Sequence, residues 1–315
     1  MPNVGILFGD QENPFWQEQL YWYNRLLPDF SFVLNAELFF PDSPRDAQCQ
    51  AGLFRDLLER GFDALIVNPL DGVALADVMR RRPLESAVFD VGPKLIPELT
   101  EGVKNYVPLR ATDFFQQGWL CGQELVRWIT RRGPFACISG PEGTRQSAGR
   151  IQGAQAAALE RHLELLPPVC GGFTREGGRD AMTQLLPEAP CALFCANDLM
   201  ALGALDILRE HDVMIPVGGV DLIPEALALV REGAMTATAG PRGEDIVRGA
   251  LRSVARYLER GELPGGYLAQ NVLVTREAAA SNKNDRVCRP QDAGPERNAS
   301  TSSGASKSSR VSASS

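Results

Sequence analysis

The chain has 315 residues, of which 44% are hydrophobic and 23% are charged, as is typical of soluble globular proteins. This length is too great for one small core and favours two domains of ordinary size. The net charge of −7 divides into +3 on the last 35 residues and −10 on residues 1–280. An acidic body without a basic cluster argues against nucleic acid as a partner.

Membrane insertion and export are both unexpected from the sequence. No apolar run approaches the roughly 20 residues that span a bilayer. Met1 leads almost directly into the apolar segment VGILFG, without the charged and apolar regions of an export signal. We therefore expect a cytoplasmic protein for the chain as written. A misassigned start site or a trimmed chain would make the periplasm or cell envelope the alternative.

The cysteines indicate a reducing compartment. There are seven of them, an odd number, and no CxxC pair occurs. Cys191 and Cys195 lie four residues apart on one predicted strand, where we interpret them as core residues. We expect no metal site and no cofactor.

Strand-like and helix-like segments alternate from the N-terminus, which predicts parallel sheets wound with helices. Asn13 and Pro14 suit the cap and first turn of a helix. The first series is expected to comprise strands at 4–9, 32–39, 62–67 and 86–89, and helices at 14–27, from 43 to about 60, and from Pro69 to about 82.

A second series follows a crossover near 106–110. Its expected strands are 135–139, 169–173, 191–196, 217–220 and 235–239. Its expected helices are 113–132, 179–186 and 224–232, with one further helix after the loop at 140–144 and another after residue 197. A helix at 244–260 and a strand at 267–274 complete the predicted fold.

These series predict two doubly wound α/β lobes, each with a parallel sheet. We expect an N-lobe of residues 1–108 with 242–268 and a C-lobe of residues 109–241 with 269–280. Three hinge crossovers, near 106–110, 240–243 and 266–270, would join them. Residues 281–315 include ten serines and no aromatic residue, so we expect disorder there.

The stretch CALFCANDLMALGALDIL at 191–208 organises the chain. An apolar strand ends at Asn197-Asp198, and leucines then recur at helical spacing. In α/β folds, ligands bind beyond the carboxyl ends of strands. Asn197 is therefore either a helix cap alone or a group that also faces a ligand.

Further polar residues follow other predicted strands, and aromatic residues accompany them. A sugar needs amides and carboxylates for its hydroxyls and flat rings for its apolar faces. The candidates for the first role are Asn13, Asp90, Asn197 and Asp221, and those for the second are Phe15, Trp16 and Phe173. Trp16 lies four residues before Leu20, so it extends the core stripe equally well, whereas Phe15 lies off that stripe.

The segments FCANDLMALGAL and Asn13-Pro14-Phe15-Trp16 resemble those of type I periplasmic sugar-binding proteins, the ribose-binding group, and of the related LacI-type repressor effector domains. The resemblance covers about 280 residues. It implies that Asn13, Asp90, Asn197 and Asp221 bind hydroxyls and that Phe15, Trp16 and Phe173 cover the sugar. It also implies closure of the lobes around the ligand and an ABC permease as partner.

Three positions depart from the family pattern: Val91 and Ala148 replace arginines, and Pro241 replaces a glutamine, although Arg150 matches. Charged donors to the ligand are thus fewer than usual, and the ligand's identity stays open. We predict the substrate-binding component of an ABC-type sugar importer, with a cytosolic ligand sensor as the alternative. No catalytic motif occurs, so we expect no enzyme.

Overall fold

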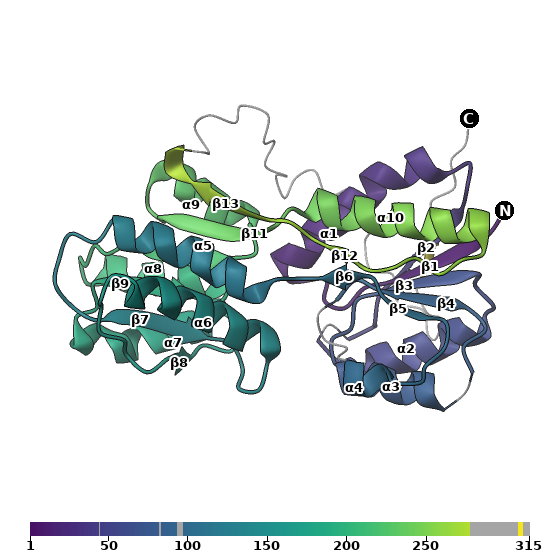
Figure 1. Ribbon diagram of the computed structural model, residues 1–315, viewed down its shortest axis with the longest axis horizontal. Coiled ribbons are helices and arrows are strands. Elements are labelled where there is room, and N and C mark those ends of the chain that lie inside the picture. Colours follow the sequence, from purple (N-terminus) through teal and green to yellow (C-terminus); the bar gives the residue numbers. More distant parts are fainter. Residues whose placement is uncertain (44, 82, 93–96, 278–307, 311–315) are drawn as a thin grey trace, which may run out of the picture. The chain divides into compact units, whose positions relative to one another are not determined.

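The computed structural model describes residues 1–43, 45–81, 83–92, 97–277 and 308–310 (Figure 1). The chain forms two compact units. Among the described residues, unit 1 contains Met1–Thr112, Gly243–Ala269 and Ser308–Arg310, and unit 2 contains Asp113–Arg242 and residues 270–277. The limits expected from the sequence, 1–108 with 242–268 and 109–241 with 269–280, remain a prediction about domains.

Unit 1 is a parallel α/β unit whose sheet has the strand order β14-β2-β1-β3-β4-β5, with only β14 antiparallel to its neighbour. Its strands are β1 (Asn3–Leu7), β2 (Asn35–Phe39), β3 (Ala64–Val67), β4 (Ala87–Asp90), β5 (Tyr106–Pro108) and β14 (Ser308–Arg310). Its helices are α1 (Pro14–Leu26), η1 (Leu27–Phe30), α2 (Ala47–Glu59), α3 (Gly72–Arg80), α4 (Pro97–Thr100) and α10 (Gly243–Arg260).

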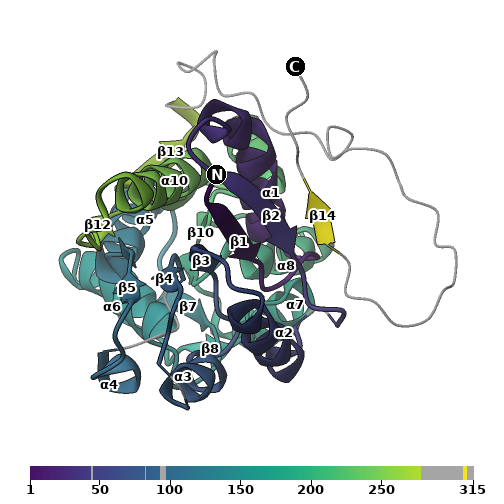
Figure 2. The ribbon, with the colours of Figure 1, turned by 90° about the vertical axis from the view of Figure 1, so that its right-hand side faces the viewer.

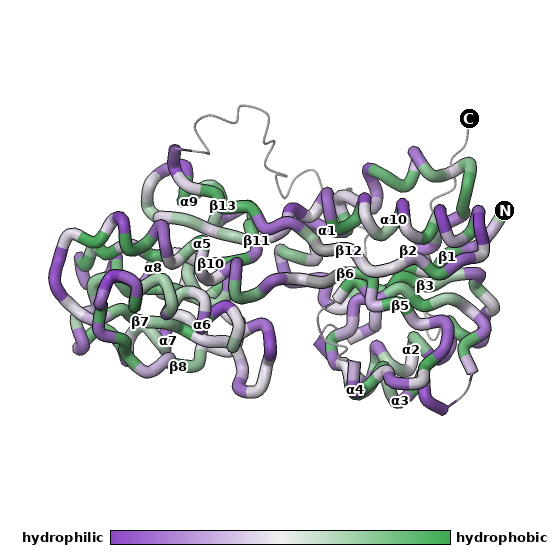
Figure 3. The backbone as a smooth tube through the Cα atoms, in the orientation of Figure 1, coloured by the Kyte–Doolittle hydropathy of each residue, from purple (hydrophilic) through white to green (hydrophobic). Residues whose placement is uncertain are grey.

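Helices cover both faces of this sheet, as Figure 2 shows. Ile6 of β1 faces a core shared with Tyr23 of α1 and Val247 of α10. The next residue, Leu7, faces the opposite core, which α2 and α3 complete. Because successive strand residues point to opposite faces, a strand buried on both sides must be apolar throughout. The ALIV sequence of β3 meets this requirement and is hydrophobic along its length in Figure 3.

Unit 2 repeats this plan with the strand order β13-β11-β10-β9-β7-β8, in which only β13 is antiparallel. Its strands are β7 (Phe135–Ser139), β8 (Val169–Cys170), β9 (Ala192–Cys195), β10 (Val217–Val220), β11 (Ala237–Pro241) and β13 (Asn271–Thr275). Its helices are α5 (Phe114–Arg127), α6 (Arg145–Leu159), α7 (Arg175–Leu185), η2 (Leu186–Glu188), α8 (Asp198–Glu210) and α9 (Pro224–Glu232). Helices α5 and α6 lie against one face of the sheet, and α7, α8 and α9 lie against the other.

Glycines allow α5 and α6 to approach backbone to backbone. A methyl group added at Gly118 of α5 would overlap the backbone oxygen of Arg150, and one added at Gly153 of α6 would overlap that of Phe115. Gly122 faces Ala154 in the same way. The crossing therefore tolerates only hydrogen at these positions, and it fixes where α6 carries its polar side chains.

The predicted two-lobed α/β architecture is confirmed, but several element limits are wrong. The strand expected from residue 32 begins at Asn35, because η1 ends in a turn that leaves Phe32 78% exposed. Helix α2 begins at Ala47 instead of near 43, because Asp46 accepts hydrogen bonds from two backbone N–H groups of its first turn. Pro44 lies outside the described residues.

The helix expected at 179–186 begins four residues earlier, at Arg175. Thr174 caps it by accepting from the N–H of Gly177. Gly177 and Gly178 lie inside the helix instead of leading into it, and at Gly178 a side chain would overlap the backbone oxygen of Met200. At Gly177 a side chain would overlap the backbone oxygen of Gly171 in the loop after β8. Close backbone contacts, which the sequence does not reveal, explain both glycines.

The strand expected at 267–274 is divided between the units. Tyr267–Leu268 (β12) pairs in parallel with Arg110–Ala111 (β6) in unit 1, whereas β13 pairs with β11 in unit 2. The expected crossover at 106–110 begins as strand β5. Within the predicted disordered tail at 281–315, Ser308–Arg310 instead forms β14, which pairs with β2. The rest of that tail lies outside the described residues.

The glycine crossing generates a stability prediction. We expect Gly118→Ala to lower the free energy of unfolding by at least about 3 kcal/mol, because the methyl group would overlap backbone that cannot rotate away. The matched control is Gly52→Ala in α2, where an added Cβ meets nothing within 4 Å. That control should gain about 0.5–1 kcal/mol from the helix preference of alanine. Urea unfolding of both variants checks the pair, and equal effects would contradict the proposed packing constraint.

Candidate ligand-binding site

Asn197 is a helix cap that also holds a neighbouring loop. It follows β9, and its Oδ1 accepts from the N–H of Met200, which caps α8 as the sequence predicts. Its Nδ2 donates to the backbone oxygen of Phe173 at 3.1 Å. The side chain is thus fixed at both ends at the carboxyl edge of the unit 2 sheet.

Phe173 lies outside β8, which ends at Cys170, and takes a left-handed backbone conformation with φ of 64°. This conformation is costly for a residue with a large side chain and persists only when its surroundings enforce it. Here the hydrogen bond from Asn197 and the packing of the ring on Gly140, where even a Cβ would overlap it, hold Phe173 in place.

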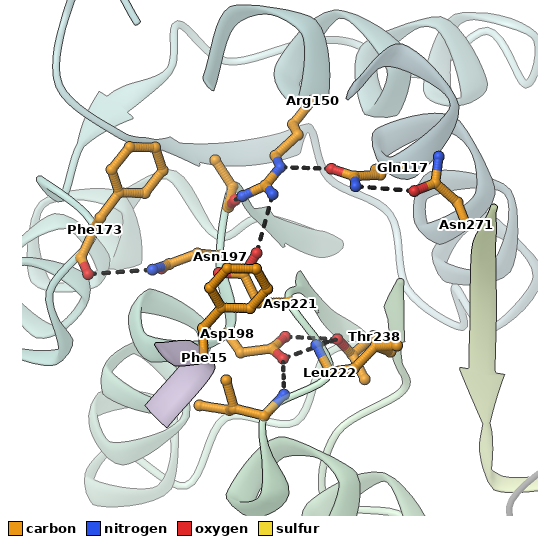
Figure 4. Close-up of polar contacts among 12 residues, drawn as sticks. Phe15, Gln117, Arg150, Phe173, Asn197, Asp198, Asp221, Leu222, Thr238 and Asn271 are labelled. Atoms are coloured by element: carbon orange, nitrogen blue, oxygen red, sulfur yellow. Dashed lines mark hydrogen bonds and ion pairs between the residues drawn. The ribbon is translucent and has the colours of Figure 1, made fainter. Parts of the chain in front are cut away.

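Asp221, which follows β10, forms an ion pair with Arg150 of α6 (Figure 4). The Arg150 Nη2 lies 3.0 Å from Asp221 Oδ1, Nη1 donates to the Ala196 oxygen at 2.7 Å, and Nε donates to Gln117 Oε1 at 2.8 Å. Both partners of the ion pair are largely buried. One N–H on each terminal nitrogen of the guanidinium makes no hydrogen bond within the described part of the chain.

Asp198 is a fully buried carboxylate behind this ion pair. It accepts from the Thr238 hydroxyl and, through Oδ2 at 3.0 Å, from the N–H of Ile223. Burial, together with the negative charge of Asp221, raises the pKa of Asp198 to about 7. Asp221 and Leu222 both have positive φ, of 119° and 59°. The Asp198 and Thr238 contacts hold this strained turn, because Leu222 N–H donates to Thr238 Oγ1.

In unit 1, Asn13 caps α1, as the sequence predicts, by accepting from the N–H of Phe15 at 3.0 Å. Phe15 and Trp16 are half-buried and meet edge to face, with their ring centroids 5.8 Å apart. Trp16 packs against the core of unit 1. This contact supports the core interpretation of Trp16 without excluding a second contact at its outer edge.

Asp90 ends β4 and is 1% exposed. Its Oδ1 accepts from the N–H of Gly92, and its Oδ2 accepts from the Tyr106 hydroxyl at 2.9 Å. Burial and the adjacent carboxylate raise the pKa of Tyr106, so that this phenol stays a donor. Val91, the first departure from the family pattern, is buried in the apolar core.

Two more polar groups lie at the same edge of unit 1. Asp10, after β1, is buried and pairs with Arg45 Nε at 2.9 Å. Asn68, after β3, is also buried, and its Oδ1 has no hydrogen-bond partner within the described residues. Gln50 of α2 donates to the backbone oxygens of both Phe8 and Asn68, so that it joins the two loops.

The structure brings Phe173 and Asn197 into direct contact and connects Asp221 to the same edge through Arg150. In unit 1, Phe15 contacts Trp16, and Asn13 accepts from the Phe15 N–H, whereas Asp90 accepts from Gly92 and Tyr106. Sequence reasoning missed Gln117, Asp198 and Thr238 as parts of the site. The sequence signal for Asp198 was its place beside Asn197, where an apolar strand gives way to a helix.

Across residues 1–43, 45–81, 83–92, 97–277 and 308–310, no cluster of three or more His, Cys, Asp or Glu side chains is placed to hold a metal ion. The helices within these ranges include none with the length and apolar character needed to cross a bilayer.

Comparison with known proteins gives matches that cover most of the two units. The sequence profile of the periplasmic binding protein domain family matches residues 4–263. The D-allose-binding periplasmic protein of Escherichia coli K12 is 26% identical over an alignment of 280 residues that covers 84% of this chain and 89% of that protein. The ribose operon repressor of the same strain is 26% identical over 221 residues, which are 68% of this chain and 62% of the repressor.

The fold is shared with solved structures. The periplasmic solute-binding protein of an ABC transporter from Actinobacillus succinogenes 130z, with bound D-allose, superposes with a TM-score of 0.80. Its sequence is 22% identical, and the superposition covers 89% of this chain and 100% of that one.

The buried carboxyl of Asp198 generates a pH prediction. Its pKa is about 7 in the folded protein, against 3.8 for an unperturbed Asp, so between these values the folded state keeps a proton that the unfolded state releases. The free energy of unfolding should therefore fall as the pH rises from about 4 to 7. Asp198→Asn, which stays neutral, should make this dependence shallower in urea unfolding measured at several pH values.

Glu18 of unit 1 also lowers the free energy of unfolding as the pH rises through this range. The Asp198→Asn variant should therefore keep part of the pH dependence. Burial raises the pKa of Glu18 to about 7, against the opposing hydrogen bonds from Trp22 and the Gly243 N–H. Glu18→Gln serves as the second variant. An Asp198→Asn protein with the pH slope of the wild type would show that this carboxyl is ionised in the folded state throughout the window.

Proposed function

Since the chain belongs to the periplasmic binding protein domain family, we propose that it binds a small polar ligand, a carbohydrate or polyol. The ligand contacts are proposed to be Asn13, Phe15, Trp16, Asp90, Phe173, Asn197 and Asp221, the residues named from the sequence. Arg150 joins them as a charged donor. The D-allose named for one relative and bound in one related structure makes a hexose the first candidate.

The observation that carries this proposal is the buried ion pair of Arg150 and Asp221 beside Asn197. Burying charged and polar groups is costly unless their hydrogen bonds are satisfied. Buried charged and polar groups at the carboxyl edge of a sheet therefore support recognition of a ligand that both donates and accepts hydrogen bonds. The hydroxyl groups of a sugar have this property.

The ligand site of unit 1 is proposed to depend on carboxylate Asp90 and on the aromatic pair Phe15 and Trp16. Val91 is buried and apolar, and Pro241 has no N–H to offer. Arg150, which matches the family pattern, is the proposed charged donor that remains. We accordingly propose a neutral sugar or polyol as the ligand, not one that requires several cationic contacts.

The importer component is the favoured cellular role, and the ABC permease is its proposed partner. The allose-binding relative is a periplasmic protein by name, and the related structure is described as part of an ABC transporter. The second candidate is a ligand sensor that signals to another protein, which the match to the ribose operon repressor supports. Cell fractionation with an antibody separates the two roles, because only an importer component works outside the cytoplasmic membrane.

Thermal unfolding against a panel of sugars, polyols and nucleosides tests the binding proposal. A ligand at 100 times its dissociation constant should add about 2.7 kcal/mol to the free energy of unfolding, which raises the transition midpoint. D-Allose, D-ribose and myo-inositol head the panel. NMR of the sugar recovered after incubation should show it unchanged, as expected for a binding protein. A cooperative transition that no compound shifts would contradict the proposal.

Two substitutions that preserve local structure test the site. Asp90→Asn keeps an acceptor for the Gly92 N–H, removes the charge and replaces the oxygen that accepts from Tyr106 with an NH₂ group. Asn197→Ser keeps a side chain able to cap α8. Each should weaken binding by about tenfold or more, because hydrogen bonds to charged or fixed groups in buried sites are lost. Affinity is measured by calorimetry with the compound that gives the largest thermal shift.

Asp63→Asn is the matched control for Asp90→Asn. Asp63 precedes β3 at the amino edge of the sheet and accepts from the N–H of Asn3 on the surface. Its substitution should leave affinity unchanged. Unchanged affinity in Asp90→Asn and Asn197→Ser as well would remove these residues from the site.

A further inference from the structure

A series of hydrogen bonds leads from Asp221 through unit 2, and Figure 4 shows it as far as Asn271. Arg150 joins Asp221 through Nη2 and Gln117 through Nε. Gln117 Nε2 then donates to Asn271 Oδ1 at 2.9 Å. Asn271 Nδ2 donates in turn to the backbone oxygen of Asp113, also at 2.9 Å.

This hydrogen-bond series ends where the polypeptide passes between the units. Asp113 is the first residue of unit 2. The polypeptide enters unit 2 again at Gln270, and Asn271 is the next residue. Asn271 also pairs, backbone to backbone, with Pro241, next to the point where the chain leaves after Arg242. Asn271 therefore lies in or contacts all three segments of unit 2 at which the polypeptide passes between the units.

The direction of every link is determined by its neighbour. An arginine only donates, so the Gln117 oxygen must face Arg150, and its NH₂ group must face Asn271. The Asn271 oxygen accepts from that group, which turns its own NH₂ toward the Asp113 carbonyl. Because Gln117 is 0% exposed, water cannot replace a lost partner without repacking.

Packing prevents the links from separating. Gln117 adjoins Gly118, and it is at Gly118 that α5 touches the backbone oxygen of Arg150. Arg150 Cζ lies 5.8 Å from the ring centroid of Phe114, which is on the same helix as Gln117, and Arg150 Nη1 donates to the Ala196 oxygen. The hydrogen bond from Arg150 Nε to Gln117 therefore determines how the guanidinium is rotated about its own axis.

We propose that Gln117 and Asn271 are positioning residues that orient Arg150 toward the ligand and tie it to the three interunit connections. The functional part of this inference rests on the proposed function, because it assigns Arg150 to ligand binding. Gln117 fixes the plane of the guanidinium, and with it the directions of the two N–H groups that make no hydrogen bond within the described residues. Asn271 fixes Gln117 in turn.

The first test needs no ligand. Nitrogen-15 NMR of the arginine side chains reports the Arg150 Nε–H, assigned by its loss in Arg150→Lys. In the wild type this proton should exchange slowly with water, since it is buried and bonded to Gln117. In Gln117→Met, a substitution of similar length and good helix propensity, its exchange should be at least about tenfold faster.

The second test measures affinity for D-allose, or for the panel compound with the largest thermal shift if D-allose gives none. Gln117→Met should weaken binding by about tenfold, chiefly through faster dissociation. Asn271→Asp, which keeps an acceptor for Gln117 but cannot donate to the Asp113 carbonyl, should weaken it as well. Combined with Gln117→Met it should add little, because both act through one guanidinium.

Gln116→Met is the matched control. Gln116 is the preceding residue of α5 and is exposed. Its side chain accepts from Asn271 Nδ2, at the far end of the hydrogen-bond series from Asp221. It should change neither the Arg150 Nε–H exchange nor the affinity. If Gln117 had a purely structural role, Gln117→Met would have a lower unfolding temperature than the wild type, but the Arg150 Nε–H exchange in the folded protein would be unchanged.

The outcomes separate the two ideas. Wild-type binding that Gln117→Met leaves unchanged, together with an unchanged Nε–H signal, would overturn the positioning role and leave the proposed function intact. Absence of wild-type binding across the panel would contradict the proposed function, while the Nε–H exchange would still decide whether Gln117 orients Arg150.

Discussion

The close crossing of α5 and α6 is the constraint on which the site of unit 2 depends. Gly118 and Gly153 leave no room for a side chain, so the two helix backbones touch. Arg150 projects from this crossing toward the carboxyl ends of the strands, where it meets Asp221 and the Ala196 oxygen. A helix separation set by ordinary side chains would move the guanidinium away from both partners.

Charge burial at the strand ends is balanced locally in both units. In unit 2, Arg150 neutralises Asp221, and Asp198 behind them is kept close to protonation by its burial. In unit 1, Asp90 is satisfied by Tyr106 and a backbone N–H. These groups stabilise the fold little by themselves, since the cost of dehydration offsets their attraction. Their value is a set of polar atoms whose directions are fixed before a ligand arrives.

Backbone strain accompanies the same residues. Phe173, Asp221 and Leu222 all have positive φ without being glycine. Each is held by a hydrogen bond from a buried side chain or to one, through Asn197 for the first and Thr238 for the last. Strained turns at strand ends, on a scaffold of regular strands and helices, are the expected arrangement of a binding site.

The sequence by itself determined the alternation of strands and helices, the two-lobed class and the caps at Asn13 and Asn197. These depend on local chemistry: apolar periodicity, and side-chain oxygens that accept from nearby N–H groups. Only the tertiary structure decided that Gly178 lies inside a helix, that β12 and β13 belong to different units and that Asp198 is buried. It also brought Gln117, Arg150 and Asn271 together, although they lie up to 154 positions apart. Such contacts arise from close packing between distant segments, which no local pattern records.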